Sequence, residues 1–278
     1  MFAHLPRRYP VPMTTRACIG LVIAIHASAC HKTEPPATTT PPSAAATPSA
    51  SAAPALAAAD TVPTASGELT IVPLRHATLL FEWAGNAIYV DPAADASYDG
   101  LPKADVILVT DIHADHMSPP TIASLRKPAA TIVVPAAVAP NLPPDGVVTI
   151  ANGESKTIAG LGVLAVPMYN LVRGPSAGKL YHDKGRGNGY VLTFADKRVY
   201  LSGDTECTPE MKALKNIDIA FVCMNLPYTM PPSEAAACIK AFRPKAVYPY
   251  HYRGSNLDEL VATVTHEGID VRLRNWYP

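Results

Sequence analysis

The stretch Asp111-Ile112-His113-Ala114-Asp115-His116 decides how this sequence is interpreted. It follows the run 105–110, whose short length and branched aliphatic residues predict a buried β-strand. It precedes Met117-Ser118-Pro119-Pro120, where Ser118 or a neighbour is expected to cap a helix that runs to about Arg126. Acidic and histidine residues on a loop directly after a buried strand are typical of functional sites in α/β proteins.

The residue types in this loop indicate metal binding. Imidazole nitrogens and carboxylate oxygens bind zinc, manganese and iron, and the tight spacing lets one loop offer several ligands. A polar, solvated turn is the alternative. One His–Asp pair would favour the turn, whereas Asp-x-His-x-Asp-His after a buried strand favours the metal site.

These residues resemble the signature loop of the metallo-β-lactamase fold superfamily, which reads His-x-His-x-Asp-His after a strand. Downstream, Ser202-Gly203-Asp204-Thr205 is similar to the Gly-Asp-Thr element of that family, and the segment 248–252 is similar to its last ligand loop, with His251 as the ligand. Upstream, the segments 76–82 and 88–92 resemble the opening hairpin of the lactonase-like hydrolase branch, whose Asp-Pro element supports the metal loop.

The resemblance covers about residues 67–278 and implies the fold class. We expect an α/β protein, an αββα sandwich of two mixed β-sheets flanked by helices, with metals at one edge between the sheets. Hydrophobic patterns alone leave several α/β arrangements open, because they show only strand-rich stretches with helices between them. The expected strands are 68–72, 77–83, 87–91, 106–110, 131–134, 147–150, 155–158, 161–166, 190–194, 198–201, 217–223 and 270–273. The later helices are expected near 209–214, 233–242 and 256–266.

The resemblance also implies two divalent metal ions. One ion would bind Asp115, His116 and His251, and the other would bind Asp111, His113 and His182. Asp204 would bridge the two ions, and Asp115 and Asp204 are the predicted catalytic residues. Asp111 stands where the family has its first His, so the ion bound by Asp111, His113 and His182 has more oxygen ligands than in the family. That change favours manganese or iron, although zinc remains compatible.

The ligand role of His182 depends on the resemblance. Tyr169 and Asn170 stand where a metal-binding His often follows the strand 161–166, and His182 is the nearest later imidazole. In the lactonase-like branch a Tyr-Asn pair followed by a His-x-Lys-Gly loop looks similar. The alternative is a solvated loop histidine.

Further residues are candidates for supporting the ligands or binding the substrate. Asp91 could orient a ligand, and His76 either does the same or is a strand-end residue bonded to backbone. Asn225 and Tyr228 follow a predicted buried strand, so they could polarise a substrate oxygen or simply form a turn. The glycine-rich basic loop 184–189 could contact an anionic substrate or be a solvated turn.

Composition limits the classes of partner. The chain has 278 residues with 48% hydrophobic residues, enough for a full core. Lys plus Arg equals Asp plus Glu at 23 each, so there is no basic field for nucleic acid and a small-molecule substrate is expected. Residues 67–278 form the predicted hydrolase-like domain. Residues 31–66 are rich in Pro, Ala, Thr and Ser and predict a disordered linker.

Residues 1–30 predict an export signal. Arg16 precedes the mostly apolar stretch 17–29, which is too short to span a bilayer, and Met13 is a candidate start. The stretch ends in Ala27-Ser28-Ala29-Cys30, which resembles a bacterial lipobox with Cys30 as the lipidated residue. We therefore expect a lipoprotein on the periplasmic side of a bacterial membrane, attached only through its lipid. A cleaved signal and a soluble periplasmic or secreted protein are the alternative.

Three cysteines remain in the predicted domain: Cys207, Cys223 and Cys238. Three cannot all pair within one chain. Cys223 and Cys238 are expected to be small core residues, while Cys207, close to Asp204 in sequence, could touch the site.

Together these features predict a metal-dependent hydrolase. A metal-bound hydroxide would act on a small ester, lactone, amide or phosphoester. The alternative is a non-catalytic metal-binding or scaffold lipoprotein on the same fold. The sequence does not predict the oligomeric state.

Overall fold

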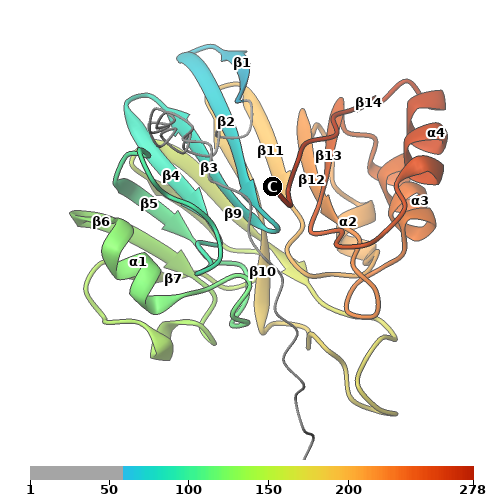
Figure 1. The fold of residues 1–278 in the computed structure, drawn as a ribbon, viewed down its shortest axis with the longest axis horizontal. Helices are drawn as coiled ribbons and strands as arrows, with labels where there is room; N and C mark the ends of the chain where they lie inside the picture. The colour runs from blue at the N-terminus through green and yellow to red at the C-terminus, as the bar shows by residue number, and fades with distance from the viewer. Residues whose placement is uncertain (1–58) are drawn as a thin grey trace, which may run out of the picture. The chain divides into compact units, whose positions relative to one another are not determined.

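Two seven-stranded β-sheets pack face to face in residues 59–278, the part of the chain that this computed structural model describes (Figure 1). The first sheet has the order β1 (Asp60–Thr64), β2 (Gly67–Arg75), β3 (Thr78–Trp83), β4 (Asn86–Val90), β5 (Ala104–Leu108), β6 (Arg126–Val134) and β7 (Val147–Thr149). The second has the order β14 (Asp270–Val271), β13 (Ala246–Tyr250), β12 (Ile219–Cys223), β11 (Lys197–Leu201), β10 (Gly187–Phe194), β9 (Leu161–Met168) and β8 (Ser155–Ile158).

Both sheets are mixed in the same way. Strands β1 to β4 pair antiparallel and β4 to β7 pair parallel, while β8 to β11 pair antiparallel and β11 to β14 pair parallel. The carboxyl ends of parallel neighbours lie at the same edge of a sheet, so the loops that follow them lie close together. This arrangement places the loop after β5 and the loops after β11 and β13 within reach of one another.

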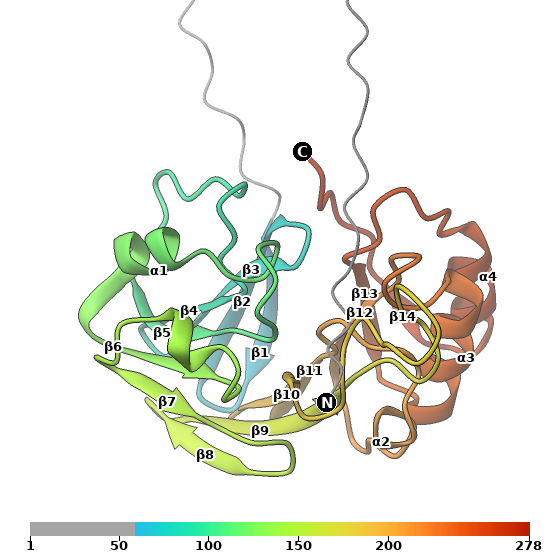
Figure 2. The same ribbon diagram turned by 90° about the horizontal axis from the view of Figure 1, so that it is seen from below.

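Helices cover the outer faces of both sheets (Figure 2). They are α1 (Pro119–Leu125), α2 (Pro209–Lys212), α3 (Pro232–Phe242) and α4 (Asp258–His266), with a short 3-10 turn at Ala139–Asn141. On α1, Ile122 and Leu125 are buried in a cluster with Tyr89 and Ile107 of the first sheet. The helix begins as predicted, because the Ser118 side chain accepts a hydrogen bond from the Thr121 backbone N–H.

The core between the sheets is aromatic and aliphatic. Phe81 of the first sheet lies 5.3 Å from Phe194 and 5.9 Å from Phe221 of the second, measured between ring centroids. All three rings are fully buried, and burying one such side chain stabilises the fold by about 2–3 kcal/mol. The predicted αββα sandwich of two mixed sheets flanked by helices is confirmed.

The predicted start of the domain at residue 67 is too late. Asp60–Thr64 form strand β1, which pairs with β2, although this Pro- and Thr-containing segment was assigned to the linker. Tertiary contacts hold the strand, because the Asp60 carboxylate accepts hydrogen bonds from Arg274 and Tyr248. The predicted export signal, the lipidation site Cys30 and most of the linker lie outside the described residues. Among residues 59–278, no helix is long and apolar enough to cross a membrane.

A disulfide joins Cys207 to Cys238, with 5.6 Å between their Cα atoms. It ties the loop after β11 to helix α3. The expectation that Cys238 is only a small core residue is therefore wrong, and Cys207 is engaged in the disulfide. Cys223 is the buried free thiol of the described residues, as predicted, and burial raises its pKa to about 12. An odd number of cysteines could not reveal which two pair.

Removing this disulfide is expected to lower the free energy of unfolding by about 2–4 kcal/mol, because the bond closes a 31-residue loop in the unfolded chain. Urea unfolding of a Cys207→Ala/Cys238→Ala double variant measures the loss. Adding a reductant should destabilise the parent protein by a similar amount and leave the double variant unchanged. Equal midpoints for parent and variant would contradict the prediction.

Candidate metal centre

The predicted ligands meet at the edge where strands of both sheets end. Each comes from a loop directly beside a strand, so the fold rather than the local sequence brings them together. His76 lies in the turn between β2 and β3, the loop 111–116 follows β5, His182 precedes β10, Asp204 follows β11 and His251 follows β13.

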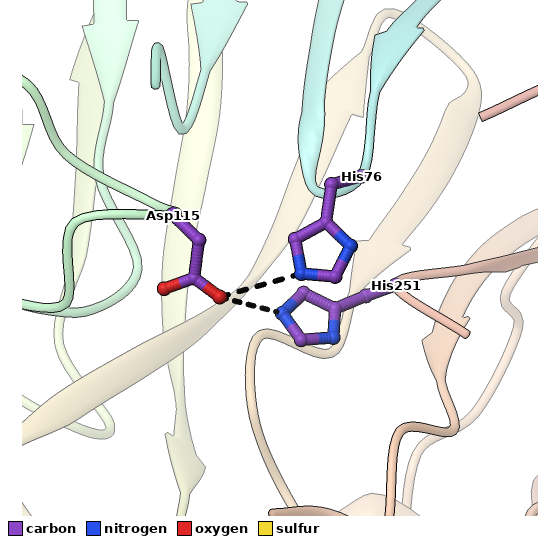
Figure 3. A group of neighbouring side chains, drawn as sticks. All are labelled: His76, Asp115 and His251. Atoms are coloured by element: carbon purple, nitrogen blue, oxygen red, sulfur yellow. Dashed lines mark hydrogen bonds and ion pairs between the residues drawn. The ribbon is translucent and has the colours of Figure 1, made fainter. Parts of the chain in front are cut away.

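A first group consists of His76, Asp115 and His251 (Figure 3). The Oδ2 atom of Asp115 lies 3.3 Å from His76 Nε2 and 3.5 Å from His251 Nε2. The two imidazole rings lie beside each other, with centroids 3.7 Å apart. His76 thus points into the site. Its backbone is also bonded, because its N–H donates to the Trp276 carbonyl and its carbonyl accepts from the His251 N–H. His76 therefore both points into the site and is a strand-end residue bonded to backbone.

A second group consists of His116, Asp204 and His251. Asp204 Oδ2 lies 3.3 Å from His116 Nε2, and Asp204 Oδ1 lies 3.2 Å from His251 Nε2. His251 therefore belongs to both the first and the second groups. All three residues are buried.

A third group consists of Asp111, His113 and His182. His113 Nδ1 lies 2.8 Å from Asp111 Oδ2, and His182 Nε2 lies 3.8 Å from the same oxygen. His182 Nε2 also lies 3.4 Å from Asp204 Oδ2. Asp204 therefore stands between the second and third groups, where the resemblance places a bridging residue. His182 is buried in the site, so it is not a solvated loop histidine.

The unpartnered atoms of these groups fit a metal ion. In each group, the candidate ligand atoms lie within 4.8 Å of one another. The Nε2 atoms of His116, His182 and His251 and the Oδ1 atom of Asp204 are buried and have no hydrogen-bond partner. Buried polar atoms are normally satisfied, and cations bound by these groups would satisfy all four atoms.

The charge balance also fits a cation. Burial alone would raise the pKa of Asp204, but the charges of His251 and His116 outweigh it and hold that pKa well below its usual value. Burial likewise opposes a charge on His116, yet the carboxylates of Asp204 and Asp91 raise its pKa well above the ordinary value. The carboxylates thus favour a proton on His116, and a metal ion would supply the same positive charge while leaving that imidazole neutral.

Asp91 holds one ligand in place. It is fully buried, and its Oδ2 atom accepts a hydrogen bond from His116 Nδ1 at 2.9 Å. Its Oδ1 atom accepts another from the Thr110 backbone N–H at 2.7 Å. This carboxylate–histidine pair fixes the ring so that Nε2 faces the site. Asp91 has a positive φ of 47°, and His76 and His251 share this uncommon backbone conformation.

A second supporting chain was not predicted. Asn170 Oδ1 accepts hydrogen bonds from the backbone N–H and from Nδ1 of His182, both at 2.8 Å. Asn170 Nδ2 in turn donates to the buried Glu206 at 3.1 Å. The pair Tyr169-Asn170 was noted in the sequence, but it did not indicate that Asn170 holds His182 in place. Glu206 stands two residues after Asp204, which is the only sequence signal that could have indicated it.

Two further residues contact the site: Tyr277, which has no sequence signal, and Arg186, which belongs to the basic loop 184–189. The Tyr277 hydroxyl lies 2.8 Å from His76 Nδ1 and accepts hydrogen bonds from the backbone N–H groups of Tyr252 and Arg253. It thereby links the turn of His76 to the loop of His251. Arg186 contacts Asp111, so the loop 184–189 is not a free solvated turn. Lys184 of that loop pairs with Glu210.

A cavity of about 430 Å³ opens beside the ligands. His76, His113, Asp115, His182, Asp204 and His251 line its polar side, and Pro175, Leu180, Tyr181, Asn225, Tyr228 and Arg253 complete it. Asn225 and Tyr228, the predicted substrate-binding candidates, therefore reach the cavity. They also form a turn, since the Asn225 carbonyl accepts from the Tyr228 N–H. The exposed Arg253 makes no ion pair within residues 59–278.

Comparison with known proteins decides the family. Residues 70–251 match the family model described as the beta-lactamase superfamily domain. The chain belongs to the β-lactamase superfamily. The matched segment contains every ligand of the three groups, and the fold is the metallo-β-lactamase fold inferred from the sequence.

Similar members of the superfamily are named as metal-dependent hydrolases. A UPF0173 metal-dependent hydrolase from Geobacillus sp. (strain WCH70) is 30% identical over 192 residues, which cover 64% of this chain and 82% of that protein. A crystal structure of a candidate metal-dependent hydrolase from Parabacteroides distasonis is 42% identical, has a TM-score of 0.73 and covers 78% of this chain and 98% of the other. A metallo hydrolase from Ignicoccus hospitalis, 23% identical with a TM-score of 0.62 over 74% of this chain and 94% of that one, shares the fold. This β-lactamase superfamily member is a metal-dependent hydrolase.

Proposed function

We propose that the chain hydrolyses a small ester, lactone, amide or phosphoester at a centre of two divalent metal ions. The observation that carries the proposal is the set of buried, unpartnered Nε2 atoms that converge on Asp204 beside an open cavity. A purely structural scaffold has no need of unsatisfied buried groups facing solvent-accessible space.

The ligand groups support zinc, manganese or iron. Asp115, Asp204, His76, His116 and His251 would hold one ion, and Asp111, His113 and His182 would hold the other, with Asp204 shared. When bound, the ions supply an activated water and polarise the oxygen under attack. Three carboxylates among the ligands make manganese and iron as suitable as zinc.

The chain's own residues would orient the substrate. Asn225 and Tyr228 offer an amide and a hydroxyl at the cavity, and these groups can donate to a substrate oxygen. The Arg253 guanidinium at the same cavity can pair with an anionic group. Apolar residues, among them Leu180, limit the cavity to a substrate of modest size.

We also propose that the protein works outside the cytoplasm, as a lipoprotein attached at Cys30 that faces the periplasm. The Cys207–Cys238 disulfide supports export, because structural disulfides form and persist in oxidising compartments. The lipid anchor would be its sole contact with a membrane, and no nucleic acid would bind. Metabolic labelling with a radioactive fatty acid, compared between the parent and Cys30→Ala, tests the anchor.

Metal content and hydrolysis measured on the same preparation test the function. The protein is purified without chelator, analysed for metals and screened against generic esters, lactones, amides and phosphodiesters. We expect up to two ions per chain and turnover that is lost on chelation and restored by zinc, manganese or iron. A protein that binds no metal, even after reconstitution, would contradict the proposal. Metal without turnover of any substrate class would favour the scaffold alternative.

A further inference from the structure

The third ligand group differs from the other two because it contains a permanent positive charge. Arg186 donates two hydrogen bonds to Asp111, from Nε to Oδ1 at 3.2 Å and from Nη2 to Oδ2 at 3.0 Å. The Asp111 side chain is fully buried, and that of Arg186 is only 21% exposed. A guanidinium carries a fixed positive charge.

The carboxylates of the first and second groups have no such partner. Within residues 59–278, Asp115 and Asp204 form ion pairs with histidines alone. A cation beside them meets two carboxylates whose charge is not balanced by Arg or Lys. A cation beside Asp111 meets, besides the shared Asp204, a carboxylate that Arg186 has already neutralised.

We propose that Arg186 makes the two metal positions unequal, so that the chain binds one ion tightly at Asp115 and Asp204 and a second ion weakly at Asp111. The inference rests on the metal centre of the proposed function and goes beyond it by assigning the order of binding. It makes Arg186 a residue that controls how many ions the centre holds at a given metal concentration.

The contacts of Asp111 give the physical reason. Its Oδ1 atom is bonded by Arg186, and its Oδ2 atom is shared by Arg186 and His113, the latter at 2.8 Å. A second ion must displace or share these contacts, and it then lies close to a guanidinium in a buried site where charge repulsion is poorly screened. The first ion shares its carboxylates with histidines alone and does not lie beside a guanidinium.

Another role for Arg186 fits less well. The sequence allowed its loop to contact an anionic substrate, but two of its donor atoms are already bonded to Asp111. Arg186 is also absent from the residues that line the cavity, whereas Arg253 is among them. The contact with Asp111 therefore makes Arg186 part of the metal centre rather than of the substrate site.

Competitive titration of the unmodified full-length chain is the first test. Metal-free protein is titrated with Zn²⁺, and separately with Mn²⁺, against a chromophoric chelator. We expect two binding steps whose dissociation constants differ by about 100-fold or more. Two steps of equal affinity overturn the inference but leave the metallohydrolase proposal intact. Failure to bind either metal would remove both proposals.

Substitution tests the cause. Arg186→Met removes the charge but keeps an unbranched side chain, and we expect the second ion to bind about tenfold more tightly or better. The first constant should change by less than about threefold. Arg186→Lys keeps the charge, so the second ion should stay weak. Lys184→Met is the matched control, because it removes a cation that pairs with Glu210 instead of a ligand, and it should leave both constants unchanged.

The direction in which Arg186→Met changes the affinity for the second ion decides between two roles of Arg186. If Arg186→Met weakens the second ion, then Arg186 orients Asp111 for binding, and the inference is overturned. Circular dichroism shows whether each variant is folded. Should Arg186→Met fail to fold, the titration of the unmodified chain still decides, because it requires no substitution.

Discussion

Asp204→Ala is expected to lower kcat/KM for the best substrate by about a thousandfold or more, equivalent to about 4 kcal/mol of transition-state stabilisation. Asp204 is the one carboxylate of the described residues that contacts three histidines of the centre, namely His116, His182 and His251. Its removal takes away the negative charge shared by two ligand groups. Steady-state kinetics at saturating metal, with metal content measured in parallel, would show the loss.

The control for Asp204→Ala is Asp183→Ala. Asp183 is exposed and next to His182, yet it forms no ion pair in residues 59–278, so its removal should leave kcat/KM within about twofold. Circular dichroism must show that both variants are folded. If folded Asp204→Ala retained the activity of the control, hydrolysis would not take place at this centre, and the scaffold alternative would be preferred.

Asp91→Ala is expected to lower the free energy of unfolding of the metal-free protein by about 3–5 kcal/mol. It would take the carboxylate away from His116 Nδ1, whose remaining neighbour is the Thr110 hydroxyl at 3.0 Å, and it would leave the buried Thr110 backbone N–H without its acceptor. Metal affinity should also fall by about 10- to 100-fold, because His116 is no longer held with Nε2 toward the site. Urea unfolding and the competitive metal titration measure the two effects separately.

Asp95→Ala is the matched control for Asp91→Ala. Asp95 lies in the same segment between β4 and β5, but its side chain is 51% exposed and, within residues 59–278, pairs only with Arg75. Its loss should change stability by no more than about 1 kcal/mol and leave metal affinity unaltered. If Asp91→Ala and Asp95→Ala lowered the free energy of unfolding and the metal affinity equally, Asp91 would not organise the centre. Asp91→Asn, which keeps an oxygen acceptor, should fall between them.

The sequence was informative wherever a function-bearing residue stands next to a strand. Asp111, Asp204 and His251 follow β5, β11 and β13 closely, and the order of these motifs resembled a known family, so their meeting at one sheet edge could be predicted. The αββα arrangement came from the same resemblance. Residue patterns alone indicate strands and helices but not which strands pair.

Apart from the role of Asp91, the contacts that support the ligands could not be predicted. Arg186 reaches Asp111, Glu206 reaches Asn170, and these pairs join segments that are distant in sequence and carry no periodic pattern. The disulfide was missed for the same reason. Strand β1 was missed because its composition resembles the linker before it, and its stability comes from pairing with β2 and from the contact of Asp60 with Arg274.

The order of the strands has a consequence for how the molecule assembles. Every strand of the first sheet precedes every strand of the second, so each sheet can form from its own half of the chain without waiting for the other. Asp115 and His251 come together only when the two halves dock, and forming a contact between residues so far apart in the sequence is slow. An ion that binds between them stabilises the docked state alone and not its precursors. Metal capture is therefore expected to be the last step of folding, and metal loss the first step of unfolding.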